Sequence, residues 1–336
     1  MRKIYLIVIL ILYWLSASAQ LDYRNYHREI IRAEELLLQS ELKPCLSLYR
    51  KTIEAYPKTF ARDAFLAFQV ACMLKDTAEI TYFFDKSVSN GVTWDAIEYS
   101  DYYKKVVSAS GPYRQRLEAL YDDCRKRYEE SLNGKLRDYI LGLLKDDDDH
   151  RTTNQDSALN VRWFAVMEMN GQKIDSIIQR NGFPGEHVTG IFNSEVELVV
   201  GSTDFPTGVQ IMPVPSRIFY HNPCAFQEVR NELLEAIKDG ELTPREYALM
   251  YEWSFDVLLR KTRWWDRYYT FRCSHPGEMD KRYNFYLNPF NYSADTAFVN
   301  QCRDEIGMCT LEHEKKLRQF GKEYRLFVRF GFNGDF

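Results

Sequence analysis

The sequence predicts a mainly α protein, with a helical-repeat N-terminal domain and a helical C-terminal domain that carries a small β element. Apolar residues recur every three to four positions through most of residues 22–145 and 221–258, as one buried face of a helix requires. Alternation of apolar and polar residues is confined to short runs in the C-terminal half. We therefore expect a leader over residues 1–19, helical repeats over 20–135 and an α-rich domain over 136–336.

The leader has the pattern of a signal peptide. Arg2 and Lys3 form a basic start, Ile4–Leu15 is an unbroken apolar run, and small residues precede the expected cleavage between Ala19 and Gln20. An apolar run of this length is short for a membrane span, although an uncleaved anchor is the alternative. We expect a periplasmic or secreted protein with no stable membrane span after cleavage.

Composition excludes some classes of partner and cofactor. The net charge of -4 argues against nucleic acid, which requires a basic face. Among the seven cysteines, Cys302 and Cys309 are the two close enough in sequence to suggest a disulfide. Cys45 and Cys72 lie in apolar helical patterns, where a free thiol packs as a small hydrophobe. Neither a C-x-x-C motif nor a His-rich tract occurs, so we expect no metal site and no cofactor.

The N-terminal helices contain a spaced pattern of small and aromatic residues. Its positions are Ala33, Cys45, Tyr49, Thr52 and Pro57. This pattern resembles one tetratricopeptide unit, and a weaker unit with Phe84 at the equivalent aromatic position follows. The resemblance implies a stack of helical pairs that binds a peptide or protein on its concave face. A scaffold without a ligand is the equal alternative.

The clearest signals for the ends of helices lie in the C-terminal half. Gly240 follows an apolar stripe that begins at Phe226, as a residue that ends a helix at positive φ should. Thr243, Pro244 and Glu246 then have the order of an N-cap, a first helical residue and the partner of a capping box. We expect a helical hairpin here.

An ordered set of short motifs surrounds this hairpin. Arg151 follows an Asp-rich run, and Ile174–Ile178, Gly182–Pro184, His221 and Gly240–Leu242 come after it. Over about residues 140–260 this set resembles an uncharacterised domain of exported bacterial proteins, often preceded by helical repeats. The resemblance implies no reaction.

Polar residues at the ends of the predicted elements are the candidate catalytic groups. Asp147, Arg151 and His221 together have the chemistry for acid–base catalysis or for holding an anion, and His187 and Gln227 accompany them. The alternative, which we favour, is a buried polar network that fixes helix packing. No G-x-S-x-G, H-E-x-x-H, P-loop or Rossmann fingerprint occurs, which disfavours an enzyme.

Two further segments carry expectations. Exposed Trp264, Trp265 and Tyr268 would stack on a sugar or a peptide, whereas burial on a short strand is the alternative. Residues 324–332 alternate between apolar and polar side chains, which predicts a half-buried strand. The four acids of 146–149 lack calcium-loop spacing, so we expect them to form a solvated helix boundary and to cap the helix that follows.

These observations favour an exported cell-envelope protein without catalytic activity, which binds a protein, peptide or glycan. A hydrolase or transferase built on Asp147, Arg151 and His221 is the alternative.

Overall fold

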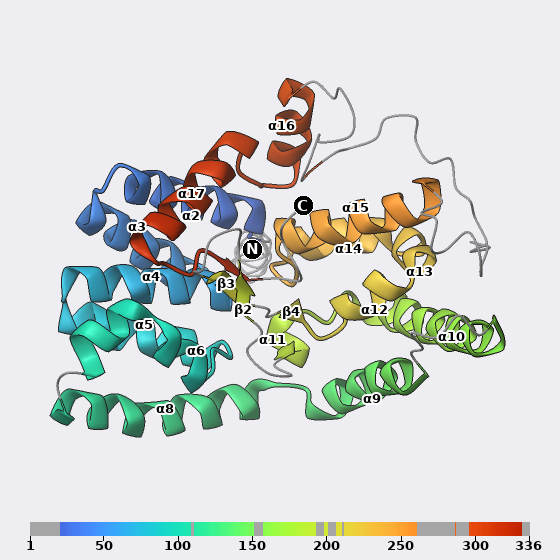
Figure 1. Ribbon diagram of the computed structural model, residues 1–336, viewed down its shortest axis with the longest axis horizontal. Helices are drawn as coiled ribbons and strands as arrows, with labels where there is room; N and C mark the ends of the chain where they lie inside the picture. The colour runs from blue at the N-terminus through green and yellow to red at the C-terminus, as the bar shows by residue number, and fades with distance from the viewer. Residues whose placement is uncertain are drawn as a thin grey trace, which may run out of the picture.

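The computed structural model describes residues 21–108, 111–150, 157–192, 198–200, 206–209, 212–260, 286 and 296–330. Its architecture is mainly α, as the helical periodicity predicts (Figure 1). The signal peptide predicted for residues 1–19 lies outside the described residues. Within the part of the chain that is described, no helix is both long enough and apolar enough to cross a bilayer.

The described chain begins with two helical pairs, α2 with α3 and α4 with α5 (Figure 1). The bounds of these helices are Tyr23–Leu38, Leu42–Ala55, Ala61–Leu74 and Thr77–Ser89. Ala33, Cys45 and Tyr49, which the repeat pattern singled out, are fully buried between helices. The paired helices are therefore observed, whereas their membership of the tetratricopeptide class stays a prediction.

Short turns connect these pairs to three longer helices. The connection consists of α6 (Trp94–Tyr99), α7 (Asp101–Tyr103) and the π-helical turn η1 (Lys104–Ser108). The long helices are α8 (Gly111–Ser131), α9 (Gly134–His150) and α10 (Ser157–Asn181). In Figure 1, α8 and α9 follow one another along one edge of the molecule, and α10 packs beside α9.

The predicted helical hairpin is present with one break. Its first arm is divided at Val229 into α13 (Pro223–Glu228) and α14 (Arg230–Lys238), because Val229 leaves helical geometry at φ -117° and ψ 20°. The second arm is α15 (Pro244–Arg260), and Gly240 between the arms has the positive φ (71°) that was expected. Residues before this hairpin form α11 (Glu186–Thr189) and α12 (Ser216–His221).

The capping box predicted at the start of α15 is half formed. Thr243 Oγ1 accepts a hydrogen bond from the Glu246 backbone N–H at 3.1 Å. The Glu246 side chain does not return to the cap; its Oε1 instead accepts from Tyr220 Oη at 3.1 Å. A tertiary contact has therefore replaced the local one.

The acidic run forms the last turn of α9, and the residues that precede the next helix lie outside the described part of the chain. Asp148 pairs with Arg217 of α12 at 2.8 Å, and Asp149 pairs with Lys145 at 2.8 Å. Negative charge at a helix C-terminus opposes the helix dipole, so these cations compensate the unfavourable position. The expectation that the run caps the following helix stays a prediction.

Two short β ladders lie between the helical halves. The first pairs β1 (Ile191–Phe192) with β4 (Met212–Pro213) in antiparallel fashion. The second places β3 (Pro206–Val209) between β2 (Leu198–Val200) and β5 (Arg329–Phe330), antiparallel to β2 and parallel to β5.

The C-terminal tail differs from the predicted half-buried strand. Helix α17 (Leu311–Tyr324) follows α16 (Thr296–Glu305) and takes up the start of that segment. Leu326, Phe327 and Val328 are then all buried. Arg325 is exposed, as the alternation predicts, and the predicted strand is confined to Arg329–Phe330, where β5 pairs with β3.

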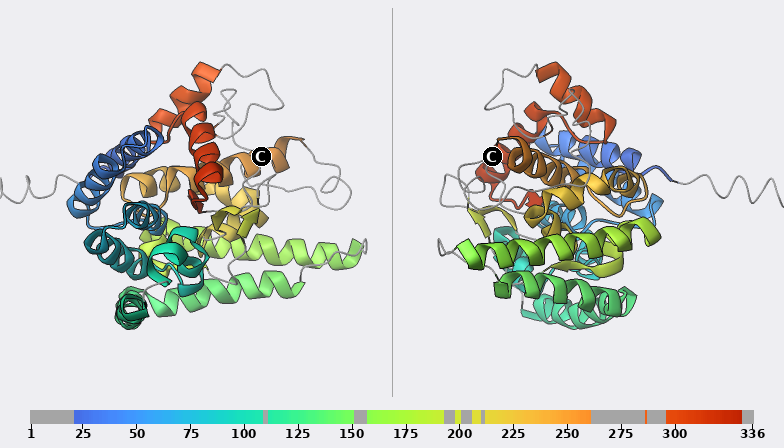
Figure 2. Two further views of the ribbon diagram at one scale, coloured as in Figure 1. Left: turned by 60° about the vertical axis from the view of Figure 1, so that its left-hand side comes forward. Right: turned by 90° about the vertical axis from the view of Figure 1, so that its right-hand side faces the viewer.

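This tail returns to the N-terminal helices, as both views in Figure 2 show for α17 beside α2. The Gln69 amide of α4 pairs with both backbone groups of Phe327, accepting from its N–H at 2.9 Å and donating to its carbonyl at 3.0 Å. Phe65 stacks on Phe327 with ring centroids 6.1 Å apart. One hydrophobic cluster therefore joins α2–α8 to the tail, and a second joins α9, α10 and α12–α16.

The predicted disulfide between Cys302 and Cys309 is wrong, because both thiols are free. The turn between α16 and α17 folds around Arg303, whose Nη2 lies 3.8 Å from Cys309 Sγ. Cys45 and Cys72 are free and fully buried, as their apolar surroundings predicted.

Candidate functional site

A cavity of about 140 Å³ lies where the two hydrophobic clusters meet. We call it the central cavity. Helices α2 and α4 form one wall, and α11, the start of α15, the turn before α17 and α17 itself form the other. Its charged and His residues are His27, Glu34, Arg62, Asp63, Glu186, Arg245, Glu246, Glu314 and Arg318. The remaining wall is mainly apolar.

One chain of ion pairs crosses the cavity from α4 to α17. Arg62 pairs with Glu34 and, at 2.9 Å, with Asp63. The other oxygen of Glu34 lies 3.0 Å from His313 Nε2, and Asp63 accepts from Tyr26 Oη at 2.9 Å. Burial alone would raise the pKa of Glu34, but the Arg62 charge and the His313 hydrogen bond together lower it. Glu34 is therefore an ionised carboxylate that links the two halves.

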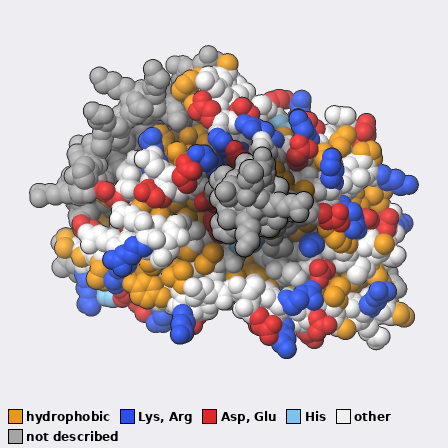
Figure 3. Space-filling model, turned by 180° about the vertical axis from the view of Figure 1, so that it is seen from behind, with side chains coloured by type: hydrophobic (Ala, Val, Ile, Leu, Met, Phe, Trp, Pro, Cys, Tyr) orange, Lys and Arg blue, Asp and Glu red, His pale blue; other side chains and the backbone are white. Residues whose placement is uncertain are grey.

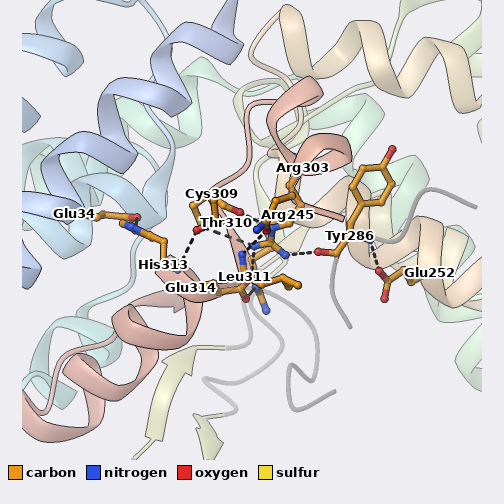
Figure 4. Close-up of polar contacts among 11 residues, drawn as sticks. Glu34, Arg245, Glu252, Tyr286, Arg303, Cys309, Thr310, Leu311, His313 and Glu314 are labelled. Carbon is orange, nitrogen blue, oxygen red and sulfur yellow. Dashed lines mark hydrogen bonds and ion pairs between the residues drawn. The ribbon is translucent and has the colours of Figure 1, made fainter. Parts of the chain in front are cut away.

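A second ion-pair group centres on Glu314 (Figure 4). Each of its oxygens meets a different guanidinium, Arg245 on one side and Arg303 on the other. Arg303 is fully buried and also donates to the backbone carbonyls of Cys309 and Tyr286. A guanidinium with this many acceptors fixes the turn before α17 in one geometry.

Two carboxyl groups of the cavity, Glu186 and Glu246, have neutral donors in their described hydrogen bonds. Glu186 accepts from the Ala61 N–H at 2.8 Å, at the first turn of α4, where Phe60 supplies no capping side chain. Burial raises the pKa of Glu186 to about 8, and the nearby Asp63 charge adds to the rise. Burial also raises the pKa of Glu246 to about 7, although Tyr220 and Arg245 oppose the change. Glu186 is therefore mostly neutral at pH 7.

Two nitrogen atoms that line this space are buried without a hydrogen-bond partner, His27 Nε2 and Arg245 Nε. His27 is only 7% exposed, and burial together with the Arg62 charge lowers its pKa to about 3. The imidazole is therefore neutral at pH 7. A buried polar nitrogen without a partner costs about 1–3 kcal/mol, which a polar ligand or water would recover.

The chemistry of the central cavity favours binding over nucleophilic attack. Burial raises the pKa of the Cys309 thiol to about 11, so the reactive thiolate is scarce at pH 7. Cys224, the cysteine nearest in sequence to His221, is disulfide-bonded. Among the described residues, no three His, Cys, Asp or Glu side chains are grouped to hold a metal ion.

A second and larger hollow, of about 910 Å³, lies between the start of α2, the start of α9, the end of α10 and α14. Leu136, Ile178, Phe183, Ala236 and Val188 form an apolar floor. We call it the acidic groove, because its charged lining residues are Glu232, Glu235, Asp239, Glu241 and a single lysine, Lys58.

Lys58 is already neutralised within the acidic groove. Its Nζ lies 2.6 Å from Glu241 Oε1 and 2.7 Å from the Asp239 carbonyl. Glu235 makes an exposed pair with Lys238 at 2.6 Å, which contributes less than about 1 kcal/mol. On the face in Figure 3, acidic and basic side chains are interspersed.

The structure describes only part of the predicted Asp–Arg–His site. Asp147 is 4% exposed and accepts a 2.7 Å hydrogen bond from the indole of Trp163. Arg151 and the side chain of His221 lie outside the described residues, although the backbone of His221 ends α12. The proposed grouping of these three residues therefore stays a prediction.

Of the other candidate residues from the sequence, the structure describes Gln227 and His187 but not the three aromatic ones. Gln227 donates to Ser254 Oγ at 3.1 Å within the helical hairpin. His187 Nε2 is buried without a hydrogen-bond partner, and its ring lies 5.6 Å from that of Phe60. Trp264, Trp265 and Tyr268 lie outside the described residues, so their predicted ligand contact stays a prediction.

Sequence reasoning missed the residues that form the central cavity. The signal in the sequence was a charged residue on an apolar stripe: Glu34 falls among Ile30, Ala33 and Leu37, where a buried face was expected. A carboxylate at such a position needs a cationic partner from elsewhere. The sequence gives no means of identifying that partner, since Arg62 and His313 are remote in the chain.

Comparison of the chain with protein-family models, with curated proteins and with solved structures found no match. The resemblances to an exported bacterial domain and to tetratricopeptide repeats therefore stay predictions.

Proposed function

We propose that this chain is an exported cell-envelope protein that binds an extended, basic peptide segment in the acidic groove. Export is supported by the basic start and apolar run of the leader, which precede small residues at Ala19. Binding is supported by one observation above the others. A hollow of about 910 Å³ combines an apolar floor with four acidic residues against one lysine.

The dimensions of the acidic groove favour a peptide. Small-molecule sites range from about 300 to 1,000 Å³, so this groove lies at the upper end. It extends across helices from both halves of the molecule. Its exposed amides, Gln179 and Asn181, have the donors and acceptors that a peptide backbone requires.

The distribution of charge favours lysine or arginine side chains in that peptide. Glu232 and Glu235 lie along the exposed side of α14, above the apolar floor around Phe183. Because Glu241 neutralises Lys58, the remaining acids give the groove a negative potential. Such a potential steers basic partners toward the surface and repels acidic ones.

Peptide binding by the mature chain tests this proposal. We would titrate the protein into a fluorescein-labelled peptide that alternates leucine with lysine, and into a matched peptide in which glutamate replaces each lysine. We expect saturable anisotropy for the lysine peptide alone, weakening as salt rises because exposed charges are screened. Glu232→Lys combined with Glu235→Lys should weaken binding at least about tenfold, which corresponds to about 1.4 kcal/mol.

Glu312→Lys is the matched control, because Glu312 is an equally exposed helical acid on α17 that does not line the groove. It should leave the affinity unchanged. The proposal fails if neither peptide binds, if both peptides bind equally, or if the double charge reversal has no more effect than the control.

A further inference from the structure

The central cavity holds more acidic groups than cationic ones. Its lining includes five acidic residues and three arginines. Arg62 is shared by Glu34 and Asp63, and Arg245 is bound to Glu314. The described contacts of Glu186 and Glu246 are to the Ala61 N–H and to Tyr220 Oη, which are neutral donors. Glu186 and Glu246 are therefore the two carboxyl groups of the cavity whose described hydrogen bonds come from neutral donors.

An independent observation places an unpartnered polar atom in the same cavity. His27 Nε2 has no hydrogen-bond partner and lines the same cavity, on a side chain that is 93% buried. Its ring lies 5.1 Å from that of Phe60, the residue that precedes Ala61 and the Glu186 contact. A neutral imidazole can accept a hydrogen bond from a cationic N–H. The Phe60 ring adds a π face, to which an ammonium is attracted.

We infer that the central cavity binds a small organic ammonium ion, with its charged group between Glu186 and His27 and a short apolar body against Met308. The remaining wall offers Ile30 and Leu317 to that body. The size fits, because a cavity of about 150 Å³ accommodates a molecule the size of benzene, and this one is about 140 Å³. A metal ion fits less well, since no set of three ligating side chains is grouped among the described residues.

Binding of an ammonium ion should release a proton. Glu186 is mostly protonated at pH 7, because burial raises its pKa to about 8. A cation beside it favours the ionised carboxylate, so the proton passes from Glu186 to the buffer as the ligand enters. We expect close to one proton released for each ligand bound at pH 7. A neutral ligand of the same shape would release none.

Isothermal titration calorimetry of the mature chain with isobutylammonium chloride tests this inference, with isobutanol as the neutral isostere. Titrations at pH 7 in phosphate and in HEPES measure the proton count, because the two buffers have different heats of ionisation and neither is a small primary amine. We expect binding of the amine alone, with heats that differ between the buffers. Glu186→Gln should abolish the proton release and weaken the amine at least tenfold.

Two further variants keep the result interpretable. Glutamine retains an oxygen for the Ala61 N–H, so Glu186→Gln should fold as the parent does. Ile31→Phe places a larger group at the half-buried cavity wall and should weaken the amine without touching a charge. Glu312→Gln, on the exposed side of α17 and outside the cavity lining, should leave amine binding unchanged. The inference is overturned if no amine binds, if isobutanol binds as well as the amine, or if neither cavity variant weakens binding.

Discussion

Replacing Glu186 with glutamine should change how stability depends on pH. In the folded protein this carboxyl is 8% exposed, and burial raises its pKa from 4.5 to about 8. The unfolded chain has the ordinary pKa, so between these values the folded state binds the extra proton. The free energy of unfolding contributed by Glu186 therefore falls as pH rises from about 4.5 to about 8.

The size of this effect follows from the two pKa values. With 4.5 in the unfolded chain and about 8 in the folded one, linkage gives a penalty of about 2 kcal/mol at pH 6. At pH 8.5 the penalty is about 4.5 kcal/mol, because the folded carboxyl must then ionise in its buried site. The difference between the two pH values is about 2.5 kcal/mol, and a glutamine does not titrate.

Urea unfolding of the parent and of Glu186→Gln at pH 6 and at pH 8.5 measures this difference. We expect the stability of the variant relative to the parent to rise by about 2.5 kcal/mol between the two conditions. Glu246, whose pKa is also raised, is present in both proteins, and its charge is one of those that raise the pKa of Glu186. Parallel pH profiles for the two proteins would refute the reasoning that Glu186 is buried as a neutral acid.

Three other substitutions test the joins between the two halves. Gly240→Ala should lower stability by about 1–3 kcal/mol in thermal unfolding, because φ is 71° and a Cβ would lie 2.6 Å from the Tyr23 ring; an unchanged midpoint would contradict this. Gln69→Ala removes both hydrogen bonds to the Phe327 backbone and should cost about 1–3 kcal/mol, with faster proteolysis of the tail; equal cleavage rates would count against it. Arg303→Met leaves a buried carboxylate with one guanidinium fewer and should cost about 3–5 kcal/mol in urea unfolding, whereas a loss below about 1 kcal/mol would show that the ion pair is dispensable.

Residues that end or begin helices were enough to predict several local features correctly. Gly240 ends a helical arm at positive φ, and Thr243 caps α15, whose first residue is Pro244. Each depends on a few neighbouring residues, whose backbone preferences act before any tertiary contact forms. The break at Val229 was not visible in this way, because its apolar side chain continues the helical stripe.

The predictions that failed had assumed a partner close in sequence. Cys302 and Cys309 are close in sequence, yet the chain folds between them around Arg303, and both thiols stay free. The Glu246 side chain, expected to complete a local capping box, is held by Tyr220. For Glu246, a contact with a residue 26 positions away displaced the expected local one.

The sequence by itself determined where the helices form, since helical periodicity and end signals are properties of short segments. Tertiary structure alone decided that the tail around Phe327 packs on α4, and that Glu34, Arg62 and Glu186 meet around one cavity. The physical reason is that a buried charge needs a partner of opposite sign or a hydrogen-bond donor. The sequence shows that a charged side chain on an apolar face needs such a partner, but only the folded chain shows which residue it is.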